Sequence, residues 1–176
     1  MTATVFGNPL PLTEDEFLAL GETQQRVELI DGSLLLSGRG APRHQYVVQA
    51  LATVLRAGDG HVLAAVNVRL RPGRILIPDL IVAADIDFDS PLVEATSVRL
   101  VAEIFSPASP AIAEVLRMHC YAAAGIRWYL LLDQETAALR GYELVGERYL
   151  ERSPAIMQQA LNLGTRIVGA GLLPPD

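Results

Sequence analysis

The chain has 176 residues, of which 51% are hydrophobic, and a formal net charge of −6. This length and hydrophobic content predict one globular domain over residues 1–176 and exclude a disordered chain, while the acidic balance does not favour non-specific attraction to nucleic acid. The apolar runs are too short to span a membrane, no secretory signal is visible and the single cysteine excludes an internal disulfide, so we expect a cytoplasmic protein without membrane contact.

The two ends of the chain are predicted to lie outside the central core. Residues 1–11 are expected to form a loose arm. Thr13 and Glu16 have the spacing of a capping box, which predicts a short helix ending at Leu20. Residues 154–176 are mostly apolar and carry no catalytic motif, so we expect a C-terminal extension that forms a short strand or packs on a partner subunit.

A β-hairpin is predicted next. The strand-like runs Arg26–Ile30 and Ser33–Ser37 flank the dipeptide Asp31-Gly32, which is typical of a two-residue hairpin turn. Side-chain alternation along the first run places Glu28 on the same face as Arg26. On this pattern alone, Glu28 is either a carboxylate that faces water or a member of a buried site.

A helix is predicted over residues 42–57, where apolar residues recur at helical spacing. Arg43 and His44 occupy its first turn, where the main-chain N–H groups and the helix dipole favour an anion. We therefore expect these two side chains to contact a phosphate group of a substrate. A surface histidine that caps its own helix is the alternative.

A long strand is predicted over residues 60–70, and the turn Pro72-Gly73 leads back into the next apolar run. Three basic residues surround this turn: Arg69, Arg71 and Arg74. They form a local basic cluster and are candidates for contact with a DNA backbone. The alternative is a solvated hairpin tip.

Two apolar runs, 75–84 and 98–105, each carry one carboxylate among residues typical of a core, and an acidic surface loop separates them. The two carboxylates are Asp79 and Glu103. A buried carboxylate is costly unless it is paired, hydrogen-bonded or bound to a cation. Two of them on successive strands indicate a shared cation, and carboxylate oxygens are ligands that Mg²⁺ prefers.

A helix is predicted from residue 107 to 124, followed by further strands at 128–133, 137–144 and 148–150. The apolar stripe of this helix consists of Ile112, Val115, Leu116 and Cys120. A second line along the helix consists of Glu114, Arg117 and Tyr121. Cys120 is therefore interpreted as a packed core thiol.

Seven short segments resemble, in order, the Uma-type family of restriction-type endonucleases within the PD-(D/E)XK superfamily. The segments are Val27-Glu28-Leu-Ile-Asp-Gly32, Pro42-Arg-His44-Gln, Val68-Arg-Leu70, Pro78-Asp-Leu80, Ala102-Glu-Ile-Phe-Ser-Pro107, Tyr121-Ala-Ala-Ala-Gly-Ile126 and Trp128-Tyr-Leu-Leu-Leu-Asp133. The resemblance extends from about Leu12 to Tyr149. It implies an α/β fold with a restriction-endonuclease-like core, a central mixed β-sheet flanked by α-helices. It also implies an endonuclease that hydrolyses DNA and acts as a homodimer.

The resemblance also implies roles for individual residues. Asp79, Glu103 and the main-chain carbonyl of Ile104 would bind Mg²⁺ or Mn²⁺, and Glu28 would hold a second ion or a metal-bound water. The family has a lysine on the following helix, and its position corresponds to Arg117 here. All 14 basic residues of the chain are arginines, so no lysine is available anywhere. Arg117 would stabilise the transition state, although an arginine does not lose its proton near neutral pH and cannot act as a general base.

Two further interpretations fit the same residues. One is a member of the fold that has lost catalysis and binds nucleic acid or a protein partner. The missing lysine and the acidic composition favour it, whereas the three carboxylates favour the enzyme. The other is a binder of a small molecule or phosphoester in the same pocket. Turnover of a nucleic-acid substrate separates the enzyme from the non-catalytic member of the fold.

Overall fold

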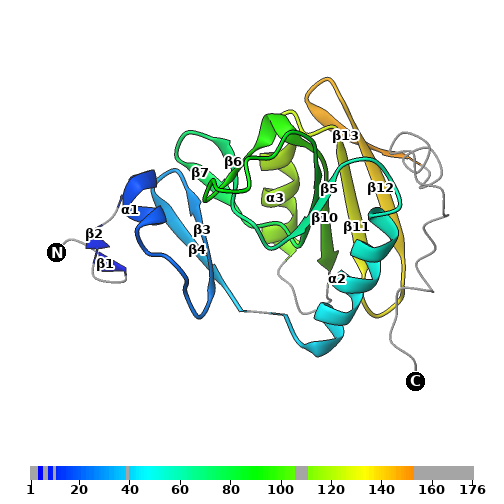
Figure 1. Cartoon of the computed structure of the whole chain (residues 1–176), viewed down its shortest axis with the longest axis horizontal. Helices are drawn as coiled ribbons and strands as arrows, with labels where there is room; N and C mark the ends of the chain where they lie inside the picture. The colour runs from blue at the N-terminus through cyan, green and yellow to red at the C-terminus, as the bar shows by residue number, and fades with distance from the viewer. Residues whose placement is uncertain (1–3, 6–7, 10, 39, 106–110, 153–176) are drawn as a thin grey trace.

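The described strands form two large sheets and one small two-stranded sheet, and helices pack against the two large sheets (Figure 1). The computed structural model describes residues 4–5, 8–9, 11–38, 40–105 and 111–152. Within these ranges, no helix is long and apolar enough to cross a membrane. The predictions for residues 106–107 and for the C-terminal extension lie outside the described residues.

The N-terminal segment begins with a small antiparallel pair, β1 (Thr4–Val5) and β2 (Asn8–Pro9), so part of the predicted arm is ordered into strands. Helix α1 (Glu14–Leu18) begins at the predicted capping box, in which the Glu16 N–H donates to Thr13 Oγ1 at 3.3 Å and the Thr13 N–H donates to Glu16 Oε2 at 2.8 Å. The helix ends slightly earlier than predicted.

The first large sheet contains the predicted hairpin. Its strands lie in the order β4 (Ser33–Ser37), β3 (Arg26–Ile30), β7 (Arg74–Leu76), β6 (Val68–Arg71), β9 (Val93–Glu94). The hairpin between β3 and β4 is confirmed. Asp31 and Gly32 at its turn both have positive φ, of 51° and 83°, which is the backbone geometry that favours an Asp-Gly pair.

The second large sheet forms the centre of the molecule. Its strands lie in the order β13 (Arg148–Arg152), β12 (Leu139–Val145), β11 (Trp128–Asp133), β10 (Val98–Phe105), β8 (Leu80–Ala83), β5 (His61–Ala64). Strands β10 and β11 run parallel and the other neighbours antiparallel. This mixed sheet confirms the predicted α/β fold class.

Two helices cover opposite faces of the central sheet. Helix α2 (Pro42–Leu55) packs against the even-numbered residues of β8, β10 and β11, such as Val82, Leu100 and Leu130. Helix α3 (Ala111–Ala123) packs against the odd-numbered residues, such as Ile81 and Val101, and it also contacts the first large sheet. Figure 1 accordingly shows α3 between the strands of the two sheets. A short 3₁₀ helix, η1 (Ala95–Ser97), leads into β10.

The predicted long strand over residues 60–70 is wrong. It is divided into β5, which pairs with β8 in the central sheet, and β6, which pairs with β7 in the other sheet. Ala65 lies at the break with φ of 52°, a left-handed conformation that interrupts the regular geometry of a strand. The run 75–84 divides in the same way into β7 and β8, so Asp79 lies where the chain crosses between sheets.

The predicted apolar stripe of α3 is also wrong as a core-facing surface. Only Cys120 of that stripe is buried, as predicted for a packed core thiol. Ile112 and Val115 expose 80% and 67% of their surface, and Leu116 is exposed as well. The helix is instead rotated so that the line of Arg117 and Tyr121 faces the protein interior.

Candidate active site

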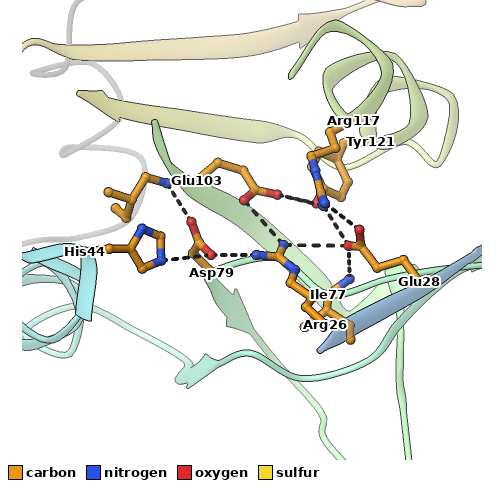
Figure 2. A network of polar contacts seen from close by, with 9 residues as sticks. Arg26, Glu28, His44, Ile77, Asp79, Glu103, Arg117 and Tyr121 are labelled. Carbon is orange, nitrogen blue, oxygen red and sulfur yellow. Dashed lines mark hydrogen bonds and ion pairs between the residues drawn. The ribbon is translucent and has the colours of Figure 1, made fainter. Parts of the chain in front are cut away.

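Three carboxylates meet where the two large sheets approach α3 (Figure 2). Among the charged residues that the structure describes, only Glu28, Asp79 and Glu103 are buried, with 0%, 7% and 8% of their surface exposed. Glu28 lies on β3, Asp79 directly precedes β8 and Glu103 lies on β10. The structure thus brings together the three carboxylates that the sequence predicts.

Pairing of the central strands places Asp79 beside Glu103. Leu80 lies opposite Ala102, so the residues next to them in sequence adjoin each other at this end of the sheet. The main-chain N–H of Ile104 donates to Asp79 Oδ2 at 2.8 Å and fixes the carboxylate against β10. The short local sequence Pro78-Asp79 therefore delivers a buried carboxylate to a defined point on the neighbouring strand.

Arg26 lies among all three carboxylates and was not predicted as a site residue. Its Nη1 donates to Asp79 Oδ1 at 2.8 Å. Its Nη2 lies 3.6 Å from Glu28 Oε1 and 3.7 Å from Glu103 Oε2. Burial acts to lower the pKa of Arg26, but the charges of Glu103, Glu28 and Asp79 outweigh burial and raise it. Arg26 is therefore a permanent cation at the centre of the site.

Arg117 forms a fork-shaped pair with Glu28. Its Nη1 donates to Glu28 Oε1 at 2.6 Å, and its Nη2 donates to Glu28 Oε2. The Ile77 N–H donates to the same Glu28 Oε1 at 2.7 Å, so the buried carboxylate is fully compensated. Glu103 lies farther from Arg117, with 3.7 Å between Oε1 and Nη1.

Tyr121 is the second residue that was not assigned a role from sequence. Its hydroxyl donates to Glu103 Oε1 at 2.6 Å. Burial and the charge of Glu103 raise the pKa of Tyr121 well above its usual value, so the phenol keeps its proton and remains a donor. Burial and the charge of Asp79 raise the pKa of Glu103 to about 7. Glu103 therefore carries its charge less readily than an ordinary carboxylate.

His44 joins the site from the first turn of α2. Its Nε2 lies 3.4 Å from Asp79 Oδ1. Burial acts to raise the pKa of Asp79, but the contacts with His44 and Arg26 outweigh it and keep the pKa below the usual value. Gly40 adjoins the imidazole so closely that an added Cβ would lie 2.2 Å from His44 Cδ2. Gly40 therefore leaves the room in which the ring turns toward Asp79.

A cavity of about 330 Å³ adjoins this network. Arg26, Asp79, Glu103 and Arg117 form one side of it. The other lining residues that carry polar groups are Ser37, His44, Glu114, Tyr129 and Gln134. Ser37 Oγ, Tyr129 Oη and Gln134 Oε1 are buried and have no hydrogen-bond partner within the described ranges. Such atoms are costly without a partner, so the cavity suits a polar ligand.

The remaining predicted contact residues lie elsewhere. Arg43 is exposed on α2, beside His44 in sequence. Arg69 pairs with Glu14 and Glu94, and Arg71 and Arg74 both pair with Asp31; the pairs are at the surface of the β6–β7 hairpin. None of these four arginines is among the described residues that line the cavity.

The donor set fits an ion bound by two carboxylates. Asp79 and Glu103 supply oxygen ligands, as Mg²⁺ and Mn²⁺ require, and such ions usually keep several waters. In the described part of the chain, no group of three or more His, Cys, Asp or Glu side chains is placed to hold an ion alone. Arg26 is already bound to Asp79 as a cation, which shows that this point of the structure accommodates positive charge.

The fold is of the restriction-endonuclease type. The model of the Uma2 family, described as "Putative restriction endonuclease", matches residues 14–169, and the chain belongs to this family. A solved structure with a similar fold is that of a "putative nuclease belonging to DUF820" from Anabaena variabilis, with 15% identity and a TM-score of 0.73 over 92% of this chain and 97% of that chain. No curated protein matches the sequence significantly.

Proposed function

We propose that the protein is a Mg²⁺- or Mn²⁺-dependent DNA endonuclease. The observation that carries the proposal is the buried pair of Asp79 and Glu103 on neighbouring strands beside a polar cavity. Burying two carboxylates together is costly, and a protein that needed only stability would gain more from apolar residues at these positions. Membership of the Uma2 family supports the same reaction class.

In this proposal, Asp79, Glu103 and the carbonyl of Ile104 are the ligands of the ion, and Glu28 is an accessory acid. The ion would neutralise charge on the phosphodiester and make a bound water more acidic. Hydrolysis forms a bond from a water oxygen to phosphorus and breaks one ester P–O bond. One proton of the water ends on the departing oxygen and the other on the new phosphate monoester.

The surrounding residues would hold the two ligands in place. The Ile104 N–H fixes Asp79 Oδ2, so Oδ1 is the oxygen directed toward Arg26 and His44. The Tyr121 hydroxyl fixes Glu103 Oε1, so Oε2 is the oxygen directed toward Arg26. Each carboxylate thus has one anchored oxygen and one directed toward the centre of the site.

Cleavage of supercoiled plasmid and of single-stranded DNA with Mg²⁺ or Mn²⁺ tests the proposal. The wild type is expected to cut, and Asp79→Asn to lose at least about a thousandfold in rate because the ion loses a charged ligand. Asp89→Asn is a matched control, since Asp89 is exposed in the acidic loop between β8 and β9. Equal rates for wild type and Asp79→Asn would contradict the proposal.

A binding protein without catalysis is the second candidate, because Arg26 already neutralises Asp79 and the chain has no lysine. Binding of labelled DNA without any cleavage, by wild type in either metal, would favour it. The expected homodimer and cytoplasmic location remain predictions. Sedimentation of the purified chain at micromolar concentration tests the first, and localisation of a tagged chain in cells tests the second.

A further inference from the structure

Two partly buried arginines of the site, Arg26 and Arg117, are candidates for the cation that a lysine supplies in the family, and their N–H groups are engaged differently. Both Nη atoms of Arg117 donate to the two oxygens of Glu28. This fork-to-fork geometry uses the face of the guanidinium that is most suited to a carboxylate or phosphate. Arg117 would have to leave Glu28 uncompensated in order to bind a substrate oxygen in the same way. Arg117 thus neutralises Glu28 and holds its carboxylate in place.

Arg26 has N–H groups that are not hydrogen-bonded to any described residue. Within the described part of the chain, only its Nη1 makes a hydrogen bond, to Asp79. Its Nε and Nη2 are buried and have no hydrogen-bond partner within the described residues, although Nη2 lies 3.6 Å and 3.7 Å from the oxygens of Glu28 and Glu103. Buried N–H groups are costly without an acceptor. Arg26 also lines the cavity, where Tyr129 Oη is a further polar atom without a partner in the described chain.

We propose that Arg26 is the catalytic residue that contacts the phosphodiester of the substrate, in the role that the family resemblance implies for Arg117. This inference rests on the proposed nuclease function. The oxygen atoms of a phosphodiester are anionic acceptors that match the free N–H groups of a guanidinium. Negative charge that develops on these oxygens during hydrolysis would be stabilised by a donor already in place.

The charges of the site explain why Arg26 can serve both the carboxylates and the substrate. Glu28, Asp79 and Glu103 outnumber the two guanidiniums, so the site carries one negative charge in excess at full ionisation. A divalent ion would reverse that sign and attract a phosphodiester. It would also compete with Arg26 Nη1 for Asp79 Oδ1, which would leave Nη1 available to the substrate as well.

The test compares Arg26→Gln, Arg26→Lys and Arg117→Gln with the wild type. Single-turnover cleavage of plasmid at saturating Mn²⁺ gives the rate, and calorimetry with Mn²⁺ alone gives the ion affinity. Fluorescence anisotropy of a labelled 20-bp duplex in EDTA gives DNA affinity. Arg148→Gln is the matched control, because Arg148 is exposed on the edge strand β13.

For Arg26→Gln we expect a loss of about a hundredfold or more in rate, with DNA affinity within about threefold of wild type. Mn²⁺ should bind more tightly, because a competing cation has been removed from Asp79. Arg26→Lys keeps the charge and should recover the rate to within about tenfold of wild type. It also covers the case in which Arg26→Gln fails to fold.

Three outcomes would overturn the inference. A rate for Arg26→Gln within threefold of wild type would show that Arg26 does not act on the substrate. Weaker Mn²⁺ binding together with an unrescued Arg26→Lys would show that Arg26 only supports the carboxylates. Loss of the rate in Arg117→Gln, with Arg26→Gln unaffected, would return the role to Arg117. If the wild type cuts nothing, the proposed nuclease function itself fails, and this inference with it.

Discussion

The arginines of the β6–β7 hairpin and those of the buried site form the same kind of ion pair in opposite surroundings. Arg71 and its partner Asp31 expose 52% and 47% of their side chains. Arg117 and its partner Glu28 expose 12% and 0%. At the hairpin, water and salt screen each charge, whereas at the site each charge depends almost entirely on its partner.

The contribution of an ion pair to stability depends on how deeply the pair is buried. Exposed pairs contribute about 0.2–1 kcal/mol. Removal of one partner from a buried pair costs about 3–5 kcal/mol, because the other charge remains buried and uncompensated. Arg71 and Arg74 pair with Asp31 at the protein surface, whereas Arg26 lines the cavity and has two buried nitrogens, Nε and Nη2, without a hydrogen-bond partner among the described residues.

The largest effect should follow from replacing Arg117 by methionine. Glu28 would lose both fork-shaped hydrogen bonds while remaining fully buried. We expect the free energy of unfolding to fall by about 3–5 kcal/mol, measured by urea denaturation in EDTA. Arg148→Met is the matched control and should change it by less than about 0.5 kcal/mol. A loss for Arg117→Met as small as that of the control would contradict the buried pair.

The next effect concerns pH. The pKa of Glu103 is raised to about 7 by burial and by the charge of Asp79, whereas an unfolded glutamate titrates near its ordinary value. The folded state binds the proton of Glu103 more tightly than the unfolded state does. Protonated Glu103 therefore contributes to the free energy of unfolding, fully below about pH 4.5, and this contribution is lost as pH rises through 7. The loss is on the order of 3 kcal/mol.

The measurement is the free energy of unfolding in EDTA at pH 5 and pH 8 for wild type and Glu103→Gln. Glutamine keeps an acceptor for the Tyr121 hydroxyl but does not titrate. The variant should therefore lose less stability than wild type over this interval. Asp79 does not change its charge between pH 5 and pH 8, because its pKa is lowered. Its contribution to stability is lost only at more acidic pH. Identical pH dependence in both proteins would refute the assignment.

Local sequence patterns predicted the parts of the site that lie within one element or between strands of one sheet. The capping box, the Asp-Gly hairpin and the pairing that brings Asp79 to Glu103 are all confirmed. The line of Arg117 and Tyr121 on α3 does face the carboxylates. The cap, the turn and the two helix residues follow from capping chemistry, turn chemistry and side-chain periodicity, which depend on near neighbours in sequence.

Long-range contacts could not be predicted in this way. Arg26 lies in the first large sheet and contacts Asp79, and no residue near Arg26 in sequence indicates that partner. The signal in the sequence that could have identified Arg26 as a site residue is the alternation that places it on the same face as Glu28. The break at Ala65 is hidden within an apolar run that would suit one long strand equally well. The exposed stripe with Ile112 shows that periodicity defines a face of a helix without showing what, if anything, covers it.

A smaller effect is expected from Gly40→Ala. The added methyl group would overlap the imidazole of His44 and turn it away from Asp79. Loss of one such contact is worth about 1 kcal/mol, or about fivefold in cleavage rate. Gly38→Ala is the control, because an added Cβ there meets no atom within 4 Å. In a His44→Ala background, Gly40→Ala should have no further effect on rate, and an additive loss would show that Gly40 does not act through the imidazole of His44.

The smallest effect is expected from Arg71→Gln at the hairpin. The pair with Asp31 is half exposed, and Arg74 remains to neutralise that carboxylate, so the free energy of unfolding should change by less than about 1 kcal/mol.

The same variant, Arg71→Gln, tests the DNA contact predicted from sequence. Each phosphate contact contributes about 0.9 to the slope of log affinity against log salt concentration. Because Asp31 already occupies Arg71, we expect an unchanged slope in anisotropy titrations at several salt concentrations. A slope reduced by about one would instead place DNA across the hairpin and extend the substrate surface well beyond the buried site.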